Sequence, residues 1–248
     1  GKPKSEKAKY LAPNRNLIGD EWLPAAAGGR FDDVNPSDIR DLLGRFPRSQ
    51  KTDVDDAVSA AKAAFPAWRL VPPPRRGLLL LACAALLKER KEVLARLMSR
   101  EMGKPLVEAR GDVQEAIDCA EFYAGEGRRL LGDTTPCELP DKMAFSIRCP
   151  IGVCGMIAPW NFPVAIPAWK IFPALLCGNT VVFKPAEDSP ACGSAFVKTL
   201  LDAGLPAGVV NLVHGFGEEA GAALVAHPDV AVISFTGSSQ TGSLIAEA

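Results

Sequence analysis

The sequence has no strong excess of either charge and very few histidines. Its 28 lysines and arginines nearly balance its 29 aspartates and glutamates, which leaves a formal net charge of -1. Such a balance gives no electrostatic basis for binding nucleic acid or an acidic membrane surface, so neither partner is expected. The only histidines are His214 and His227, and no two of the seven cysteines form a CxxC pair. We therefore expect no zinc site and no other metal site.

Long apolar runs are absent as well. The longest, residues 77–87, is too short to span a bilayer and predicts a buried helix. Residues 1–7 are basic but do not contain the apolar segment of a signal peptide, so a secretory leader is not expected. An odd number of cysteines without such a signal favours reduced thiols in the cytoplasm, most of them as small core residues.

A chain of 248 residues, 48% of them apolar, is long enough for one large domain or two modest ones. In the first third, residues 16–22 and 30–34 predict short strands, and Thr52 with Asp55 resembles a capping box at the start of a helix. Further helices are expected over residues 75–100 and 105–124. The second of them has charged side chains that predict a face turned to solvent, formed by Glu108, Asp112, Glu115 and Glu121.

The second half of the chain alternates two kinds of segment. Strands are predicted at residues 152–158, 180–183, 209–213 and 230–235, and helices at 166–176, 189–203 and 218–226. Strands that alternate with helices predict parallel β-α-β units, so the expected fold class is α/β, with a sheet covered on both faces. Residues 132–149 fit neither pattern and predict a β-hairpin that leaves the main body.

An asparagine between two prolines follows the first strand of this series, in Pro159-Trp160-Asn161-Phe162-Pro163. In open α/β sheets, ligands bind beyond the carboxyl ends of the strands. A rigidly held asparagine there can direct its amide N–H toward charge that develops on a substrate oxygen. The alternative is a proline-bounded turn in which the Asn161 side chain only bonds to nearby backbone.

A lysine and a carboxylate follow the second strand, in Lys184-Pro185-Ala186-Glu187. At the end of a strand, a carboxylate can accept hydrogen bonds from ribose hydroxyls, and an ammonium can bind a hydroxyl or a phosphate. The alternative is an exposed ion pair on a loop, which contributes little.

Two turns rich in small residues allow the backbone to approach a ligand closely. Residues 235–238 (FTGS) begin a helix whose free N–H groups can bind a pyrophosphate, unless Ser238 merely caps that helix. Residues 215–220 (GFGEEA) match a GxGxxG/A pattern, but the two glutamates in it would repel phosphate. We therefore expect Gly217 to lie in a tight turn that lines the pocket, and the pyrophosphate to bind at Gly237.

Taken in order, these motifs resemble the NAD(P)-dependent aldehyde dehydrogenase family. The resemblance covers nearly the whole chain and, besides the asparagine between prolines, includes residues 16–22 (NLIGDEW), 64–68 (AFPAW), 101–105 (EMGKP), 178–180 (GNT), 184–187 (KPAE) and 235–238 (FTGS). No one motif is decisive, but the ordered set is specific. The resemblance implies a Rossmann-like parallel sheet with flanking helices, and the oxidation of an aldehyde to a carboxylic acid with NAD(P).

The resemblance also implies roles for individual residues. Asn161 would be the side-chain donor of the oxyanion hole. The cofactor-binding residues would be Ile157, Ala158, Pro159 and Trp160 near the nicotinamide, Lys184, Pro185, Ala186 and Glu187 near the adenosine ribose, Gly217 and Gly221 near the adenine, and Phe235, Thr236, Gly237 and Ser238 near the pyrophosphate. A carboxylate beside the ribose 2′-hydroxyl disfavours a 2′-phosphate, so Glu187 favours NAD over NADP.

The resemblance divides the chain into two parts. Residues 1–131 and 151–248 would form a discontinuous cofactor-binding domain, and residues 132–150 would be the hairpin that bridges subunits in a homodimer or homotetramer. Part of an aldehyde pocket would come from Phe162, Ile166, Trp169 and Lys170. These residues leave fatty, aromatic, amino- and semialdehydes open as substrates.

The nucleophilic cysteine and the general-base glutamate of the family match no residue of this chain. In the family, the cysteine thiolate attacks the aldehyde to form a thiohemiacetal, and the glutamate assists the water that releases the acid. Both lie after the turn that corresponds to Gly237 and Ser238, and Glu247 comes too early to be the base. We therefore expect the C-terminal catalytic domain to be absent and these 248 residues alone to be inactive. Two hypotheses stay open: an aldehyde dehydrogenase completed by further chain, or a non-catalytic nucleotide-binding or assembly fragment.

Overall fold

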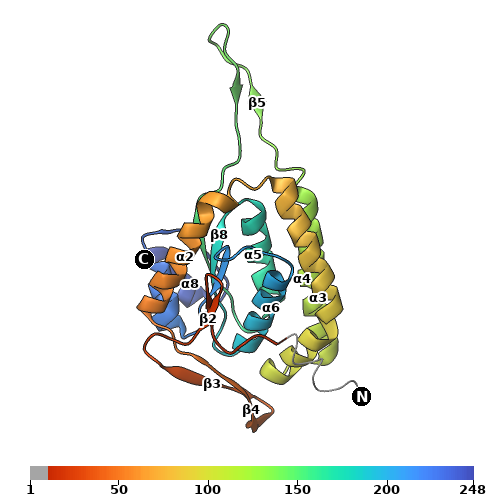
Figure 1. The fold of residues 1–248 in the computed structure, drawn as a ribbon, viewed down its shortest axis with the longest axis vertical. Helices are drawn as coiled ribbons and strands as arrows, with labels where there is room; N and C mark the ends of the chain where they lie inside the picture. The colour runs from red at the N-terminus through yellow and green to blue at the C-terminus, as the bar shows by residue number, and fades with distance from the viewer. Residues whose placement is uncertain (1–10) are drawn as a thin grey trace.

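The computed structural model describes residues 11–248 and has a central sheet of six strands in the order β10-β7-β8-β9-β1-β2 (Figure 1). The parallel part consists of β7 (Val153–Ile157), β8 (Thr180–Lys184), β9 (Val210–Leu212) and β10 (Val230–Phe235). At the other edge, β1 (Asn16–Ile18) and β2 (Glu21–Leu23) pair antiparallel. The predicted α/β class and the predicted strands of the second half are confirmed. The expectation about a leader concerns residues 1–7, which lie outside the described residues.

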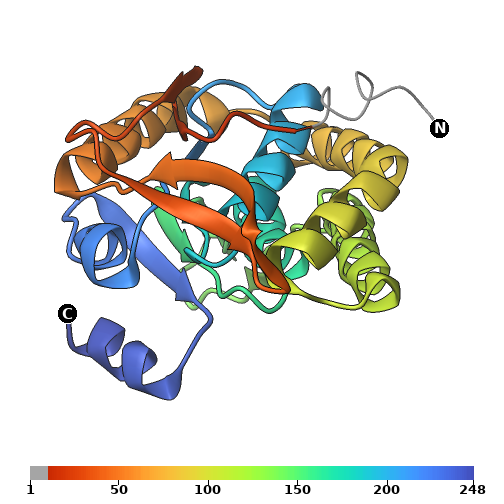
Figure 2. The same cartoon turned by 90° about the horizontal axis from the view of Figure 1, so that it is seen from below.

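Alternate residues of the parallel strands pack against helices on opposite faces of the sheet (Figures 1 and 2). Cys154 and Met156 of β7 belong to a large core, and Val153 and Ile157 belong to a smaller one. The large core lies against α3 (Pro73–Met102), α4 (Leu106–Glu126), α5 (Ala165–Leu176) and α6 (Pro190–Asp202), and the smaller against α2 (Lys51–Trp68) and α7 (Ala222–Val225). Because both faces are covered, β7 and β8 are buried along their whole length and are mainly apolar, as is typical of a parallel sheet, whereas the edge strand β10 is only partly buried.

The N-terminal strands differ from the prediction. Residues 16–22 are not one strand, because the chain turns at Gly19, whose φ of 67° favours glycine, and β1 and β2 form a hairpin there. β3 (Arg30–Asn35) pairs with a long strand, β4 (Asp38–Pro47), for which no strand was expected. Charged and apolar residues are mixed irregularly in β4, and most of them are exposed or partly exposed, so its sequence does not show the apolar alternation of a half-buried strand.

The start of α2 is fixed by Asp53 rather than by the predicted pair of Thr52 and Asp55. The Asp53 carboxylate is buried, and its two oxygens accept hydrogen bonds from the backbone N–H of Gln50 at 2.9 Å and of Ala26 at 2.8 Å. Asp53 is three residues after the N-cap residue Gln50, so the predicted capping box is wrong in its register.

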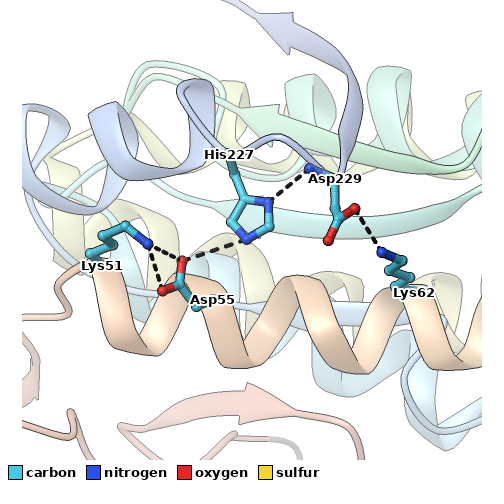
Figure 3. A network of polar contacts seen from close by, with 5 residues as sticks. All are labelled: Lys51, Asp55, Lys62, His227 and Asp229. Carbon is cyan, nitrogen blue, oxygen red and sulfur yellow. Dashed lines mark hydrogen bonds and ion pairs between the residues drawn. The ribbon is translucent and has the colours of Figure 1, made fainter.

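Asp55 instead belongs to a surface network that joins α2 to the loop between α7 and β10 (Figure 3). Its carboxylate pairs with Lys51 and lies 3.5 Å from Nε2 of His227. Nδ1 of His227 accepts a hydrogen bond from the backbone N–H of Asp229, so the ring proton of the neutral imidazole is on Nε2 and faces Asp55. The Asp229 carboxylate pairs with Lys62 of α2. Since these pairs are partly exposed, the network joins two elements but stabilises them little.

Asp112 corrects the expected solvent-facing side of α4. Glu108, Glu115 and Glu121 are exposed or partly exposed, but the Asp112 side chain is fully buried. Its Oδ2 pairs with the ammonium of Lys104 at 3.0 Å, and its Oδ1 accepts a hydrogen bond from the backbone N–H of Ala165 at 2.8 Å. The sequence of α4 does not show that α5 packs against it, and α5 covers Asp112.

The predicted hairpin is present and projects from the body as a long arm (Figure 1). Its short strands are β5 (Thr134–Thr135) and β6 (Ala144–Phe145), and most of its side chains are exposed. Cys137 and Cys149 are exposed on it, whereas Cys83, Cys154 and Cys192 are buried, so only three of the seven cysteines are fully core residues. Across residues 11–248, no helix combines the length and the apolar character needed to cross a bilayer.

Candidate active site

A cavity of ≈ 560 Å³ opens at the carboxyl ends of β7 and β10. Its other walls are the helical turn η1 (Gly217–Gly221), α7 and the helix α8 (Ser239–Glu247). Five of the predicted cofactor-binding residues lie on these walls, although they come from distant segments: Ile157, Glu187, Gly217, Gly221 and Phe235. The same walls include Glu218 of the GFGEEA turn and residues that no sequence motif singled out, namely Ala222, Val225, Ala226, Thr241, Leu244, Ile245 and Ala248.

Lys184 lies behind the wall of this cavity rather than on it. Its side chain is 3% exposed, its Nζ donates to the backbone carbonyl of Pro185 at 2.8 Å, and Oε2 of Glu187 is 3.4 Å away. Burial lowers the pKa of Lys184, and the neighbouring carboxylate of Glu187 opposes that change. The alternative of an exposed ion pair on a loop is therefore wrong for the lysine, because the charge of Lys184 is held inside the protein.

Gly221 explains how η1 approaches this lysine. A Cβ atom on Gly221 would lie 3.6 Å from Cδ and Cε of Lys184, in ordinary contact with the side chain. The turn therefore packs directly on the stem of Lys184, and Gly217 and Glu218 at its start reach the cavity.

In the turn before α8, Ser238 has the capping role that was the alternative to pyrophosphate binding. The Ser238 hydroxyl accepts a hydrogen bond from the backbone N–H of Thr241 at 3.1 Å, so Ser238 is the N-cap of α8. Thr236, Gly237 and Ser238 are not on the walls of the cavity, whereas Thr241, in the first turn of the helix, is. The structure thus places the start of α8 beside the cavity.

Ala158, Pro185 and Ala186 are buried, and none of them lines the cavity. Their backbone extends the pairing of the strands, since Ala158 N–H donates to the carbonyl of Lys184 and Thr236 N–H donates to that of Ile157. These two hydrogen bonds extend the pairing of β7 with β8 and with β10.

Asn161 lies on the segment between β7 and α5, with its side chain exposed. Within residues 11–248, no hydrogen bond joins the Asn161 amide to another residue, so the alternative in which it only bonds to nearby backbone finds no support in the structure. The adjacent Pro159 is half-buried and Trp160 is exposed. The amide is therefore free to donate to a bound molecule.

A second cavity, of ≈ 330 Å³, lies on the other side of Glu187 and is bordered by Trp160. Trp160 and Ile157, both expected near the nicotinamide, thus border different cavities, and Glu187 borders both. Asp33 and Glu101 are buried on its walls, where burial raises the pKa of Asp33 to about 6. The sequence indicated no role for this acidic pair, because its members come from β3 and α3. Across residues 11–248, no group of three or more His, Cys, Asp or Glu side chains is arranged to hold a metal ion.

The predicted aldehyde-pocket residues follow Asn161 in the chain, Phe162 directly and the others on α5. The rings of Phe162 and Trp169 stack with centroids 6.3 Å apart, and both are partly exposed. Ile166 is buried, and Nζ of Lys170 donates to the hydroxyl of Ser234 at 3.1 Å. Phe162 and Trp169 thus form an exposed aromatic pair, and neither of the two cavities is lined by the four residues together.

The model of the aldehyde dehydrogenase family matches residues 22–248. The alpha-ketoglutaric semialdehyde dehydrogenase of Bacillus subtilis is 43% identical over 98% of this chain and 49% of its own length. An NADP-dependent enzyme of E. coli superposes with a TM-score of 0.94 at 40% identity, over 97% of this chain and 50% of that one. PnpE, solved in complex with nicotinamide adenine dinucleotide, superposes with a TM-score of 0.91 at 41% identity, over 94% of this chain and 48% of that one.

The chain spans about half the length of the curated relatives it matches. The match nonetheless covers nearly all of the residues whose fold is described, and it agrees with the resemblance found in the motifs. The chain belongs to the aldehyde dehydrogenase family.

Proposed function

We propose that this chain is the cofactor-binding part of an enzyme that oxidises an aldehyde to a carboxylic acid with NAD. The observation that carries the proposal is the convergence of Ile157, Glu187, Gly217, Gly221 and Phe235 on one cavity at the carboxyl ends of parallel strands. Residues 1–131 and 151–248 would together form the cofactor-binding domain. Its seven free cysteines suit a reducing cytoplasm.

The residues present suit a dinucleotide. Glu187 would accept hydrogen bonds from the adenosine ribose, and the ammonium of Lys184 behind it would balance the negative charge of the carboxylate and the phosphates. The start of α8 would present backbone N–H groups to the pyrophosphate. NAD, when bound, supplies the hydride acceptor.

Asn161 would act as the oxyanion donor. Its exposed amide has no partner within the described chain and can donate to the oxygen of a bound aldehyde as negative charge develops there. None of the cysteines borders the cavity among the described residues, so we assign the nucleophile and the base to chain beyond residue 248.

The electrostatics of the cavity favour NAD over NADP. The carboxylates of Glu187 and Glu218 both border it, and a 2′-phosphate placed there would be repelled by both. The relatives include an NADP-dependent enzyme, so we assign this preference to the two carboxylates of this chain rather than to the family.

The hairpin would join subunits. Leu139, Met143, Phe145 and Ile147 are exposed on it, and apolar side chains on a projecting arm are buried when a second copy covers them. A homodimer or homotetramer would result.

The test is aldehyde-dependent formation of NADH by the full-length protein. The panel should contain fatty, aromatic and amino-aldehydes and alpha-ketoglutaric semialdehyde, which the name of the Bacillus subtilis relative gives as its substrate. NADH formation with one of these classes supports the proposal. Tight NAD binding without turnover of any aldehyde would instead support a non-catalytic nucleotide-binding protein.

A further inference from the structure

We propose that Lys104 is a positioning residue for Asn161, which it holds in place through Phe162 and Asp112. The inference rests on the proposed role of Asn161 as oxyanion donor. The Asn161 amide makes no hydrogen bond within residues 11–248, so its orientation must be set by the segment that carries it.

Lys104 lies in the short connection between α3 and α4, with its side chain only 7% exposed. Its ammonium is 3.8 Å from the centroid of the Phe162 ring and 3.0 Å from Oδ2 of Asp112. A desolvated ammonium over an aromatic face is attracted to the ring more strongly than an ammonium at an exposed site. Lys104 therefore holds the ring of the residue directly after Asn161.

Asp112 fastens the same segment from its other end. Its Oδ1 accepts a hydrogen bond from the backbone N–H of Ala165, the first residue of α5. The N-cap residue Val164 has no side chain that can accept this bond, so Asp112 supplies the missing acceptor from another helix. The charge of Asp112 is in turn balanced only because Lys104 is buried beside it.

Asn161 lies between the end of β7 on one side and these two contacts on the other. On its N-terminal side, the segment leaves β7 with the N–H of Ala158 bonded to the carbonyl of Lys184. On its C-terminal side, Lys104 holds Phe162 and Asp112 holds Ala165. Without Lys104, the ring of Phe162 loses its cation and Asp112 is left as an unpaired buried charge, so Asn161 would sample orientations that do not match the oxyanion.

The test is a double-mutant cycle in the full-length protein, measured as the single-turnover rate of NADH formation. A displacement of about 1 Å at a reacting group can cost about a hundredfold in rate, so Lys104→Met should lower the rate by about tenfold to a hundredfold. In the Asn161→Ala background, Lys104→Met should change the rate by less than about twofold, because residues that act through one another are not additive. The Kd for NAD should stay unchanged, and Lys104→Arg, which keeps the cation, should restore most of the rate.

Lys88→Met is the matched control. Lys88 extends from α3 and pairs with Glu121 of α4, so it belongs to the pair of helices that the Lys104 segment connects. Its ion pair is exposed and includes neither Phe162 nor Asp112. Its rate should equal that of the unmodified enzyme.

Lys104→Met alone could unfold the segment, because it leaves Asp112 unpaired. The double variant Lys104→Met/Asp112→Asn removes both charges and keeps an acceptor for Ala165 N–H. It should fold with a Tm near that of the unmodified enzyme and still lose rate through Asn161. Equal losses with and without Asn161→Ala, in either variant, would overturn the positioning role. An Asn161→Ala enzyme with an unchanged rate would overturn the proposed function instead, so the two failures differ in outcome.

Discussion

Gly237 lies so close to the ring of Phe235 that a Cβ atom on residue 237 would overlap Cζ of that ring. The ring is part of the cavity wall, and the glycine is part of the turn that begins α8. The cavity wall and the turn are therefore in direct contact, and neither can change without displacing the other.

Gly237→Ala should weaken NAD binding. The new methyl group would overlap the Phe235 ring and must displace this part of the cavity wall. We expect the Kd for NAD of the full-length enzyme to rise about tenfold, the equivalent of about 1.4 kcal/mol. Gly242→Ala is the control, because its Cβ would meet the same ring at 3.6 Å, an ordinary contact. Equal Kd values for the two variants would contradict this prediction.

Glu187→Gln should shift cofactor preference toward NADP. Removing one carboxylate from the cavity wall removes part of the repulsion of a 2′-phosphate. The ratio of kcat/KM with NADP to that with NAD should rise about tenfold. Glu219→Gln should leave the ratio unchanged, because Glu219 pairs with Arg48 and does not border the cavity. A shift of the same size in both variants would show that net charge alone is responsible.

The buried His214 should make the folded protein less stable as the pH falls. Its Nε2 lies 2.9 Å from the Ser194 hydroxyl, and burial lowers the pKa of His214 from 6.5 to about 3. Between these values the unfolded chain binds a proton that the folded chain does not, so the free energy of unfolding decreases by up to about 1.4 kcal/mol per pH unit. The stability that depends on neutral His214 is fully present above the pKa of 6.5 that His214 has in the unfolded chain. Urea titrations of the full-length protein at about pH 7 and about pH 5 should show a smaller decrease in His214→Gln; an identical decrease would refute the assignment.

Asp53→Ala should destabilise the protein by about 1 to 2 kcal/mol, because two backbone N–H groups lose their acceptor at the buried start of α2. Asp55→Ala, in the exposed network of Figure 3, should change the free energy of unfolding by less than about 0.5 kcal/mol. Denaturant unfolding of both variants makes the comparison. If Asp55→Ala were the more damaging, the predicted capping pair would be the better description of this helix start.

The parallel half of the fold could be predicted because its central strands are covered on both faces and are therefore mainly apolar. Ile157, Glu187 and Phe235 follow or end such strands. Parallel strands bring their carboxyl ends to one edge of the sheet, so the sequence alone is enough to expect that these residues converge there.

The remaining features depend on contacts between distant segments, which a local pattern does not contain. Asp112 has the spacing of a solvent-facing residue and becomes buried only because α5 and Lys104 cover it. β4 is a strand because it pairs with β3, and its own residues show little alternation. Asp53 accepts the capping hydrogen bond of α2, but Thr52 beside it is equally typical of a helix start, so the sequence alone does not distinguish the two.

Glu187 borders both cavities, and this has a thermodynamic consequence. A charged molecule bound in either one acts on the same carboxylate and so alters the potential that the other presents. Linkage is reciprocal: if an occupant of the cavity beside Trp160 strengthens binding in the cavity beside Phe235 by some factor, the second occupant strengthens the first by the same factor. Charged occupants of the two volumes would therefore be coupled through one side chain.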